Sequence, residues 1–339
     1  MSKVCTGNLS ADMTPRTKPA TLKDVAKVAG VSISTVSRVF SSPGRISVET
    51  SDRVREVARE LRFTPNVMAR SLITGTSPNI GLVVPDISNP YMTTLLKAAQ
   101  KVSRGHQTGI FVADTDDNAE IEREVCEQFA QQSRGVILCA PRMSAVHIRE
   151  ISGIVPLVLV NRIVEGIPSV YTDSRSALRE LLDELVEQGH RRVGYLPGPA
   201  GSWSNKQRAR TVADRARALE IELVRLDPTD GTHADGVLAA DQVIELGITA
   251  VMAFDDVLAA GLVEGLRRRG KSVPEDVSVT GHDDILSELV HPGLTTVTGQ
   301  SAQVGELAIS RLLDASGPES VGVQATVVRR HSTAAPRSR

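Results

Sequence analysis

Aromatic side chains are scarce in this chain of 339 residues: Phe, Trp and Tyr together make up 3% of it, and tryptophan occurs once. A pocket that sandwiches a flat purine between rings is therefore not expected. No apolar run approaches the roughly 20 residues that cross a bilayer, so we expect no membrane association. Residues 1–20 contain no apolar segment of the kind that directs secretion. We expect them to form a disordered arm on a cytoplasmic protein.

Cysteine is also rare. Cys5, Cys126 and Cys139 are odd in number and lack the spacing of metal ligands, so we expect no disulfide framework and no metal site. The chain has no Gly-rich phosphate loop and no nucleophile elbow, and we expect neither a cofactor nor an enzyme. The adjacent His282 and Asp283 suggest general-base chemistry, but His282 also fits a ring packed at the end of a strand.

The net charge of −1 conceals an asymmetry. Residues 1–72 contain twelve Lys and Arg against six Asp and Glu, a net +6, which leaves −7 for the rest of the chain. A basic N-terminal segment suits contact with the phosphates of nucleic acid, and the acidic remainder of the chain does not. For the four arginines between 53 and 62, a solvated helix face explains the pattern equally well.

The basic segment begins with the pattern of two short helices around a glycine. Thr21 can cap the first helix, with Asp24 at capping-box spacing. Gly30 supplies a tight turn, and Ser32 can cap the second helix. This is the helix-turn-helix pattern, whose second helix places its first residues against base edges in the major groove. On its outer side lie Ile33, Ser34, Ser37 and Arg38.

Those outer side chains suit base recognition. Arg38 can pair with guanine, and Ile33 can pack on a thymine methyl group. A third helix is predicted from Ser47 to about Arg62, and its apolar stripe contains Val48, Val54, Val57, Ala58 and Leu61. Together these helices define a headpiece over 21–65.

A short hinge helix is predicted after Pro65, where Asn66 can cap a helix from Val67 to about Leu72. Such a helix is marginal alone in water. Paired with a second copy, it can enter the minor groove and insert Leu72 between base pairs. We therefore interpret 66–76 as hinge helix and linker.

From residue 77 onward, strands alternate with helices, which indicates parallel βαβ units. Buried strands are expected at 79–85, 108–113, 135–139 and 157–160, and a second set begins near Val170, with strands at 192–196, 222–226, 250–254 and 277–280. Ligands of such sheets bind beyond the carboxyl ends of the strands. The loops there begin at Asp86, Asp114, Asn161, Gly198, Asp255 and His282, and they offer groups that can bind a polyol.

The chain resembles the lactose repressor / galactose repressor family of bacterial transcription regulators. The matching segments include TLKDVAKVAGVSISTVSRVF, SDRVREVARELRFTPN, NVMARSL, IGLVVPDISNPYM, QGHRRVGYLPGP and VPEDVSVTGHDD. The resemblance implies an all-α helix-turn-helix head with a hinge helix, followed by a two-lobed α/β core similar to periplasmic sugar-binding proteins. It also implies a homodimer on a near-palindromic operator in double-stranded DNA, controlled by a small molecule, most often a sugar.

The resemblance also assigns residues and boundaries. The expected DNA contacts are Thr21, Ser32, Ile33, Ser34, Thr35, Ser37, Arg38, Asn66, Ala69, Arg70 and Leu72. The expected effector contacts are Tyr91, Met92, Ser202, Ser204, Arg208, Asp255 and Asp283. In the core of 77–335, lobe one is expected at 79–167 and 295–320 and lobe two at 168–294 and 321–335, before a tail at 336–339. No leucine heptad follows Val328, so a tetramer-forming coiled coil is not expected.

Several of these positions have structural alternatives. Asp255 and Asp256 can cap the helix expected to start at Val257, and Asp284 fits a structural role. Tyr91 can belong partly to the core, and Asn161 and Arg162 can hold the lobes together. Trp203 can stack on a sugar or pack its own loop.

This chain departs from the family pattern at Met92, Thr211, Gly231, Asp255 and His282. The acidic Asp255, where Asn is frequent, favours a neutral polyol or a cation, although Arg208 keeps an anionic ligand open. The rival function is solute capture for transport by a two-lobed binding protein, or regulation by a ligand that is not a sugar.

Overall fold

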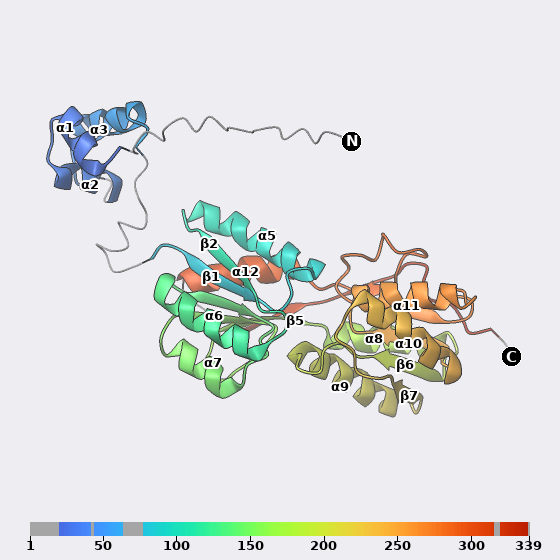
Figure 1. The fold of residues 1–339 in the computed structure, drawn as a ribbon. Coiled ribbons are helices and arrows are strands. Elements are labelled where there is room, and N and C mark those ends of the chain that lie inside the picture. The colour runs from blue at the N-terminus through green and yellow to red at the C-terminus, as the bar shows by residue number, and fades with distance from the viewer. Residues whose placement is uncertain (1–19, 42–43, 64–76, 315–318, 338–339) are drawn as a thin grey trace, which may run out of the picture. The chain divides into compact units, whose positions relative to one another are not determined.

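The computed structural model describes residues 20–41, 44–63, 77–314 and 319–337. The chain divides into two compact units, 1–75 and 76–339 (Figure 1). The arm expected at 1–20, except its last residue, and the hinge helix with Asn66, Ala69, Arg70 and Leu72 lie outside the described residues, and the tail is described only at 336 and 337.

The described part of the first unit contains three helices, α1 (Leu22–Ala29), α2 (Ile33–Ser41) and α3 (Val48–Glu60). The predicted capping box is present: the Thr21 amide donates to Asp24 at 2.8 Å, and the Asp24 amide donates to the Thr21 hydroxyl at 3.4 Å. Gly30 ends α1 with a φ of +66°. Eight buried side chains form the small core: Val25, Ala26, Ala29, Val36, Val39, Val54, Val57 and Ala58.

The prediction that Val48 joins this core is wrong, because its side chain is 77% exposed. Helical residues advance about 100° each, so Val48 points roughly 120° away from Val54. The buried stripe of α3 therefore begins at Val54.

Lobe one of the second unit is a six-stranded parallel sheet in the order β11-β5-β4-β3-β1-β2. Its strands are β1 (Ile80–Val84), β2 (Ile110–Asp114), β3 (Val136–Cys139), β4 (Leu157–Val160), β5 (Ser169–Asp173) and β11 (Ser320–Gln324). Helices α5 (Pro90–Gly105) and α12 (Ser301–Asp314) cover one face, and α6 (Ala119–Gln132) and α7 (Ala145–Ser152) cover the other (Figure 1).

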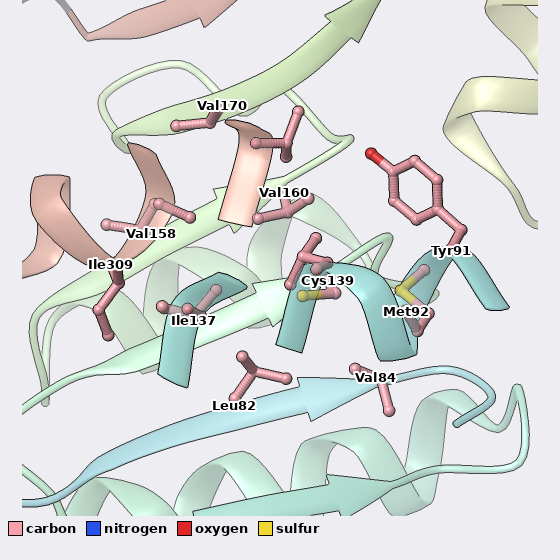
Figure 2. Close-up of a cluster of buried hydrophobic side chains, with 14 of the residues drawn as sticks. Leu82, Val84, Tyr91, Met92, Ile137, Cys139, Val158, Val160, Val170 and Ile309 are labelled. Carbon is pink, nitrogen blue, oxygen red and sulfur yellow. The ribbon is translucent and has the colours of Figure 1, made fainter. Parts of the chain in front are cut away.

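The core under α5 and α12 extends to the end of the sheet where ligands are expected. Figure 2 shows Leu82, Ile137 and Val158 in its interior, with Tyr91 at its edge. Burial of such side chains is the main favourable contribution to folding. The start of α5 is therefore anchored firmly at that edge.

Lobe two is a four-stranded parallel sheet in the order β7-β6-β8-β9. Its strands are β6 (Arg192–Leu196), β7 (Glu222–Arg225), β8 (Ala250–Ala253) and β9 (Ser278–Thr280). Helices α8 (Arg175–Glu187) and α9 (Trp203–Ala218) pack together, as do α10 (His233–Glu245) and α11 (Asp256–Arg268). None of the described helices is long and apolar enough to cross a membrane.

The lobe boundaries differ from those expected at 167/168, 294/295 and 320/321. Strands β5 and β11 both belong to the first sheet, where Ser169–Asp173 pair with Ser320–Gln324 over five residues. Residues 295–298 still bridge to the end of lobe two, through Thr280 and Asp283. Because β5 and β11 pair along their full length, lobe one extends to Asp173 at the first crossing and to Gln324 at the third. Because residues 295–298 bridge to lobe two, lobe one resumes only after Thr298. Strands β10 (Thr296–Val297) and β12 (Val327–Val328) pair at the crossing.

Candidate functional site

A cavity of about 390 Å³ lies where the carboxyl ends of both sheets meet. This volume lies within the usual range for small-molecule sites. The cavity brings together all seven side chains expected to contact an effector: Tyr91, Met92, Ser202, Ser204, Arg208, Asp255 and Asp283.

The lobe-two wall is built around Arg208, which projects from α9 and is 6% exposed. Its Nη1 donates to the Phe254 carbonyl oxygen at 2.6 Å, and its Nη2 lies 3.5 Å from the Asp283 carboxylate. The guanidinium also lies 4.7 Å from the centre of the Phe254 ring, a cation–π contact. These contacts fix the orientation of a buried cation in the cavity.

Asp283 is held from two sides. His282 Nδ1 lies 2.7 Å from its Oδ1. Burial opposes ionisation of Asp283, but the charge of Arg208 and the His282 hydrogen bond lower its pKa below the usual value. Burial lowers the pKa of His282 to about 4, so this ring is neutral at pH 7. The prediction that His282 is a packed ring is confirmed, since it is fully buried.

Asp255 both caps a helix and lines the cavity. Its Oδ1 accepts from the Leu258 amide at 2.9 Å, as an N-cap does, and its Oδ2 lies 3.5 Å from Asn89 Nδ2 in lobe one. Burial and then the Asp283 charge raise the pKa of Asp255 to about 7. Near neutral pH, Asp255 is therefore present in both its protonated and its ionised form.

The expectation that Asp256 caps this helix is wrong. Helix α11 begins at Asp256 itself, one residue earlier than predicted. Its carboxylate accepts from the Thr296 hydroxyl at 2.7 Å and the Ile285 amide at 2.9 Å. Asp256 thereby ties the start of α11 to two later segments of the chain, at Ile285 and Thr296. Asp284 is structural as expected, since it accepts from Ser287 and pairs with Arg330 at 2.8 Å.

The part of the lobe-one wall around Tyr91 is uncharged. The Tyr91 hydroxyl lies 3.0 Å from Asn161 Nδ2 and 3.2 Å from the Thr172 hydroxyl. The Asn161 Oδ1 accepts from the Thr172 amide at 3.0 Å. Burial raises the pKa of Tyr91 to about 12, so it stays a neutral hydroxyl. Asn161 therefore orients Tyr91 within lobe one, and it does not join the lobes through these bonds.

Met92 and Tyr91 belong to the hydrophobic core as well as to the cavity wall, as Figure 2 illustrates. Ser202 is the N-cap of α9 and accepts from the Asn205 amide at 3.2 Å. The ring of Trp203 packs edge-on against Tyr171, 5.8 Å between centroids, and lines a smaller neighbouring cavity of about 90 Å³. The ring thus packs against lobe one and not only within its own loop, and its contact with a sugar stays a prediction.

Sequence reasoning missed some of the wall. Arg142, Asp117 and Phe254 line the cavity, yet none was expected to contact a ligand. Arg142 follows β3 by three residues and Asp117 follows β2 by three. The rule that ligands bind beyond strand ends applies to both. The loop beginning at Asp114 was expected at the cavity without Asp117 being singled out, whereas the end of β3, followed by Ala140 and Pro141, was not considered.

The expected DNA-contacting residues gather at the start of α2. Ser32, Ile33, Ser34 and Arg38 are exposed, and Ile33 keeps 49% of its surface accessible. The Ser32 hydroxyl accepts from the Thr35 amide at 3.1 Å, which caps the helix. Thr35 and Ser37 are half-buried, and the exposed Thr21 is engaged in its capping box. An exposed isoleucine and an exposed arginine on one helix suit contact with base edges.

Comparison with known proteins identifies the family of both parts of the chain. Residues 21–66 match the model of bacterial regulatory proteins of the lacI family, and 182–333 match a periplasmic binding protein-like domain. The transcriptional repressor CytR of Escherichia coli (strain K12) is 30% identical over 315 residues, covering 89% of this chain and 92% of the relative. The E. coli regulator GalR is 31% identical over 336 residues, covering 94% and 96%.

The chain belongs to the lacI family. It is a DNA-binding transcriptional regulator and not an enzyme. Among solved structures, a lac repressor dimer bound to operator and the anti-inducer ONPF superimposes with a TM-score of 0.85 at 25% identity, covering 94% of this chain and 100% of that one. A lacI-family regulator of Enterococcus faecium with bound ribose gives a TM-score of 0.69 at 26% identity, covering 76% and 99%.

Proposed function

We propose that this protein is a dimeric repressor that binds a near-palindromic operator and is controlled by an unphosphorylated sugar or polyol in the cavity between its lobes. The observation that carries the proposal is the charge of that cavity. Six aspartates line it, against two arginines. Both arginines are already paired with an aspartate, Arg142 with Asp117 and Arg208 with Asp283.

A phosphorylated ligand would enter an excess of negative charge, which costs free energy at close range. A neutral polyol instead meets carboxylate acceptors, serine hydroxyls and arginine donors, the groups that bind sugar hydroxyls. A relative bound to ribose and the ribose operon repressor of Bacillus subtilis, 30% identical over 298 residues, support a sugar as ligand.

The dimer has support in lobe one. Strand β2 is the edge of its sheet, and it exposes Phe111 by 41% and Val112 by 39%, with Ile121 of α6 exposed by 40%. Exposed apolar patches mark interaction sites. We assign this edge to contact with a second copy, which would bring two headpieces to the two halves of an operator.

The test uses the full-length protein. Operator fragments are selected from genomic DNA, and their affinity is measured with D-ribose, D-galactose, cellobiose, D-glucosamine or D-ribose 5-phosphate present. We expect a dimer by light scattering, nanomolar binding to selected fragments, and a response to at least one unphosphorylated probe but not to the phosphate ester. A monomer without fragment preference would contradict the regulator. A response confined to the phosphate ester would contradict the neutral effector.

A further inference from the structure

Hydrogen bonds tie together the three segments in which the chain crosses between the lobes. Thr172 lies near the end of β5, beside the first crossing, and its hydroxyl donates to the Gly299 carbonyl oxygen at the second crossing, at 2.5 Å. The Thr298 amide donates to the Thr326 carbonyl oxygen at 2.9 Å, and the Thr326 amide donates to the Thr298 hydroxyl at 2.9 Å. These bonds join the second crossing to the third, so the crossings form one connected unit.

Thr172 connects this unit to the lobe-one wall of the cavity. Because its own proton is donated to Gly299, the Thr172 hydroxyl oxygen accepts from the Tyr91 hydroxyl, 3.2 Å away. The Tyr91 oxygen in turn accepts from Asn161 at 3.0 Å. The donors therefore run in one direction, from Asn161 through Tyr91 and Thr172 to the backbone of Gly299. Hydrogen bonds aligned in this way strengthen one another and act together.

Gly299 also connects the crossings to the lobe-two wall. Its amide donates to the Asp283 carbonyl oxygen at 3.1 Å, and the Asp283 amide donates to the Val297 carbonyl oxygen at 2.7 Å. Asp283 has a φ of +104°, a backbone conformation that L side chains rarely adopt. Such a residue persists only where its surroundings hold it in place. The second crossing therefore holds Asp283 in the conformation in which it lines the cavity.

Gly299 occupies a point at which a side chain would not fit. A Cβ there would lie 2.9 Å from Asp283 Cα, 2.9 Å from Asp283 Oδ1 and 3.0 Å from Tyr91 Cε2. These distances are well inside the optimal separation of about 3.5–4.0 Å between carbon atoms. The missing side chain thus lets cavity-lining residues of both lobes approach the same point of the backbone.

We propose that Gly299 and Thr172 are positioning residues, which tie the cavity-lining Tyr91 and Asp283 to the crossings and so convert effector occupancy into a change of lobe angle. This inference rests on the proposed sugar-responsive function. An effector that contacts both walls stabilises one spacing of Tyr91 and Asp283. Because both residues are bonded to the crossings, that spacing selects one arrangement of the lobes. The ligand then shifts the equilibrium by its differential affinity for the two arrangements.

The first test measures coupling in the full-length protein, with whichever of D-ribose, D-galactose or cellobiose binds the wild type. The coupling ratio is the operator affinity without sugar divided by that with saturating sugar. Thr172→Val keeps the side-chain shape but removes the hydroxyl, and Thr172 does not line the effector cavity. We expect its sugar affinity to stay within about threefold of wild type, while its coupling ratio moves at least about threefold closer to one.

Thr172→Ser keeps the hydroxyl and should restore the wild-type coupling ratio. Thr93→Val is the matched control, because the exposed Thr93 hydroxyl bonds only to the Pro90 carbonyl oxygen within α5. A wild-type ratio in Thr172→Val, or a loss that Thr172→Ser does not restore, would overturn the assignment. A lower melting temperature with an unchanged ratio would show a purely structural role.

The second test adds a methyl group at the meeting point of the walls. Gly299→Ala must displace Tyr91 or Asp283, and we expect the sugar affinity to fall by about tenfold or more. Gly105→Ala, whose added Cβ meets nothing within 4 Å, is the control, and neither glycine has a positive φ. Wild-type sugar affinity in Gly299→Ala would contradict the close approach of the walls. If Gly299→Ala does not fold, the Thr172 variants decide the question.

The third test needs no ligand. Tyr91→Phe, Thr172→Val and the double variant are unfolded in urea, and a double-mutant cycle compares them. We expect removal of the Thr172 hydroxyl to matter less once the Tyr91 hydroxyl is gone, because the two form one chain of hydrogen bonds. Additive effects would contradict the tie. If no sugar changes operator binding by the wild type, the proposed function fails, whereas this cycle still shows whether the cavity wall is tied to the crossings.

Discussion

The two lobes line one cavity with different chemistry. Lobe one carries its charged groups, such as the Arg142–Asp117 pair, beside a neutral hydroxyl and amide network of Tyr91, Asn161 and Thr172. Lobe two offers the buried ion pair of Arg208 and Asp283 with Asp255 beside it. Removing one member of a neutral network leaves a polar group unpaired, whereas removing one member of a buried ion pair leaves a charge unpaired, which costs more. The lobe-two wall should therefore tolerate substitution less well.

Arg208→Met should have the largest effect. It leaves Asp283 buried without its guanidinium, and breaking such a pair typically costs about 3–5 kcal/mol of folding free energy. We also expect effector binding to be lost. Urea unfolding at pH 7 measures the first effect and calorimetry the second. Adding Asp283→Asn should recover part of the stability but not the binding. A lone Arg208→Met variant as stable as the wild type would show that the pair is not desolvated.

Asp255→Asn should stabilise the protein in a pH-dependent way. The fold raises the pKa of Asp255 from 3.8 to about 7, so its ionised form is disfavoured. The contribution of the wild-type aspartic acid to stability is then full below pH 4 and is lost as pH rises through 7. Asparagine still caps α11 but cannot ionise.

We expect the gain in unfolding free energy from Asp255→Asn to be near zero at pH 4. Above pH 7 it should reach at most about 4 kcal/mol, at ~1.36 kcal/mol per pKa unit. Melting temperatures from pH 4 to pH 8 check it, with Asp86→Asn at the exposed rim of the cavity as the control. A difference that is flat across this range would refute the raised pKa.

Tyr91→Phe tests the neutral network of lobe one. The variant keeps the ring that packs in the lobe-one core but leaves the Asn161 amide short of an acceptor, a loss of about 1–3 kcal/mol. Because the tyrosine is neutral up to high pH, the loss should be the same at pH 5 and pH 8. Urea denaturation at both values would show it. A loss that grew with pH would mean that the network around Tyr91 does not stay uncharged.

Ser202→Ala removes an uncharged hydroxyl from the lobe-two wall and should have the smallest effect on stability. It removes the side-chain cap of α9, which is worth about 1 kcal/mol. As for Tyr91→Phe, the loss of stability should not change with pH. Ser204 lies one residue into the helix and makes no cap bond. Comparing Ser204→Ala with Ser202→Ala therefore separates the loss of the cap from the loss of a ligand contact.

Local patterns carried most of what could be predicted from the sequence. The capping box of Thr21, the turn at Gly30 and the strands that precede the cavity depend on neighbouring residues, so they could be placed directly. Val48 failed because one apolar residue at a helix start does not reveal which side the helix buries. The lobe boundaries failed because β5 and β11 pair across about 150 positions of sequence, and no local signal records that partnership.

The cavity walls were predicted only in part for a similar reason. Seven contacts came from resemblance and from polar groups after strands. Arg142 was missed because its place in the wall depends on the carboxylates of Asp117 and Glu122, which lie 20 residues or more before it in the sequence. Whether Asp255 or Asp256 caps α11 depends on where this helix starts. Sequence patterns locate a helix start only to within a few residues.

The most direct test is a reciprocal titration on the full-length wild-type protein. The operator affinity is measured with and without a saturating sugar, and the sugar affinity is measured with and without operator. If one dimer couples the cavity to its headpieces, the two ratios must be equal and differ from one, because coupling free energy is reciprocal. We predict equal ratios of at least tenfold, which Arg208→Met abolishes. Ratios of one, with both ligands bound tightly, would contradict control of DNA binding by the cavity.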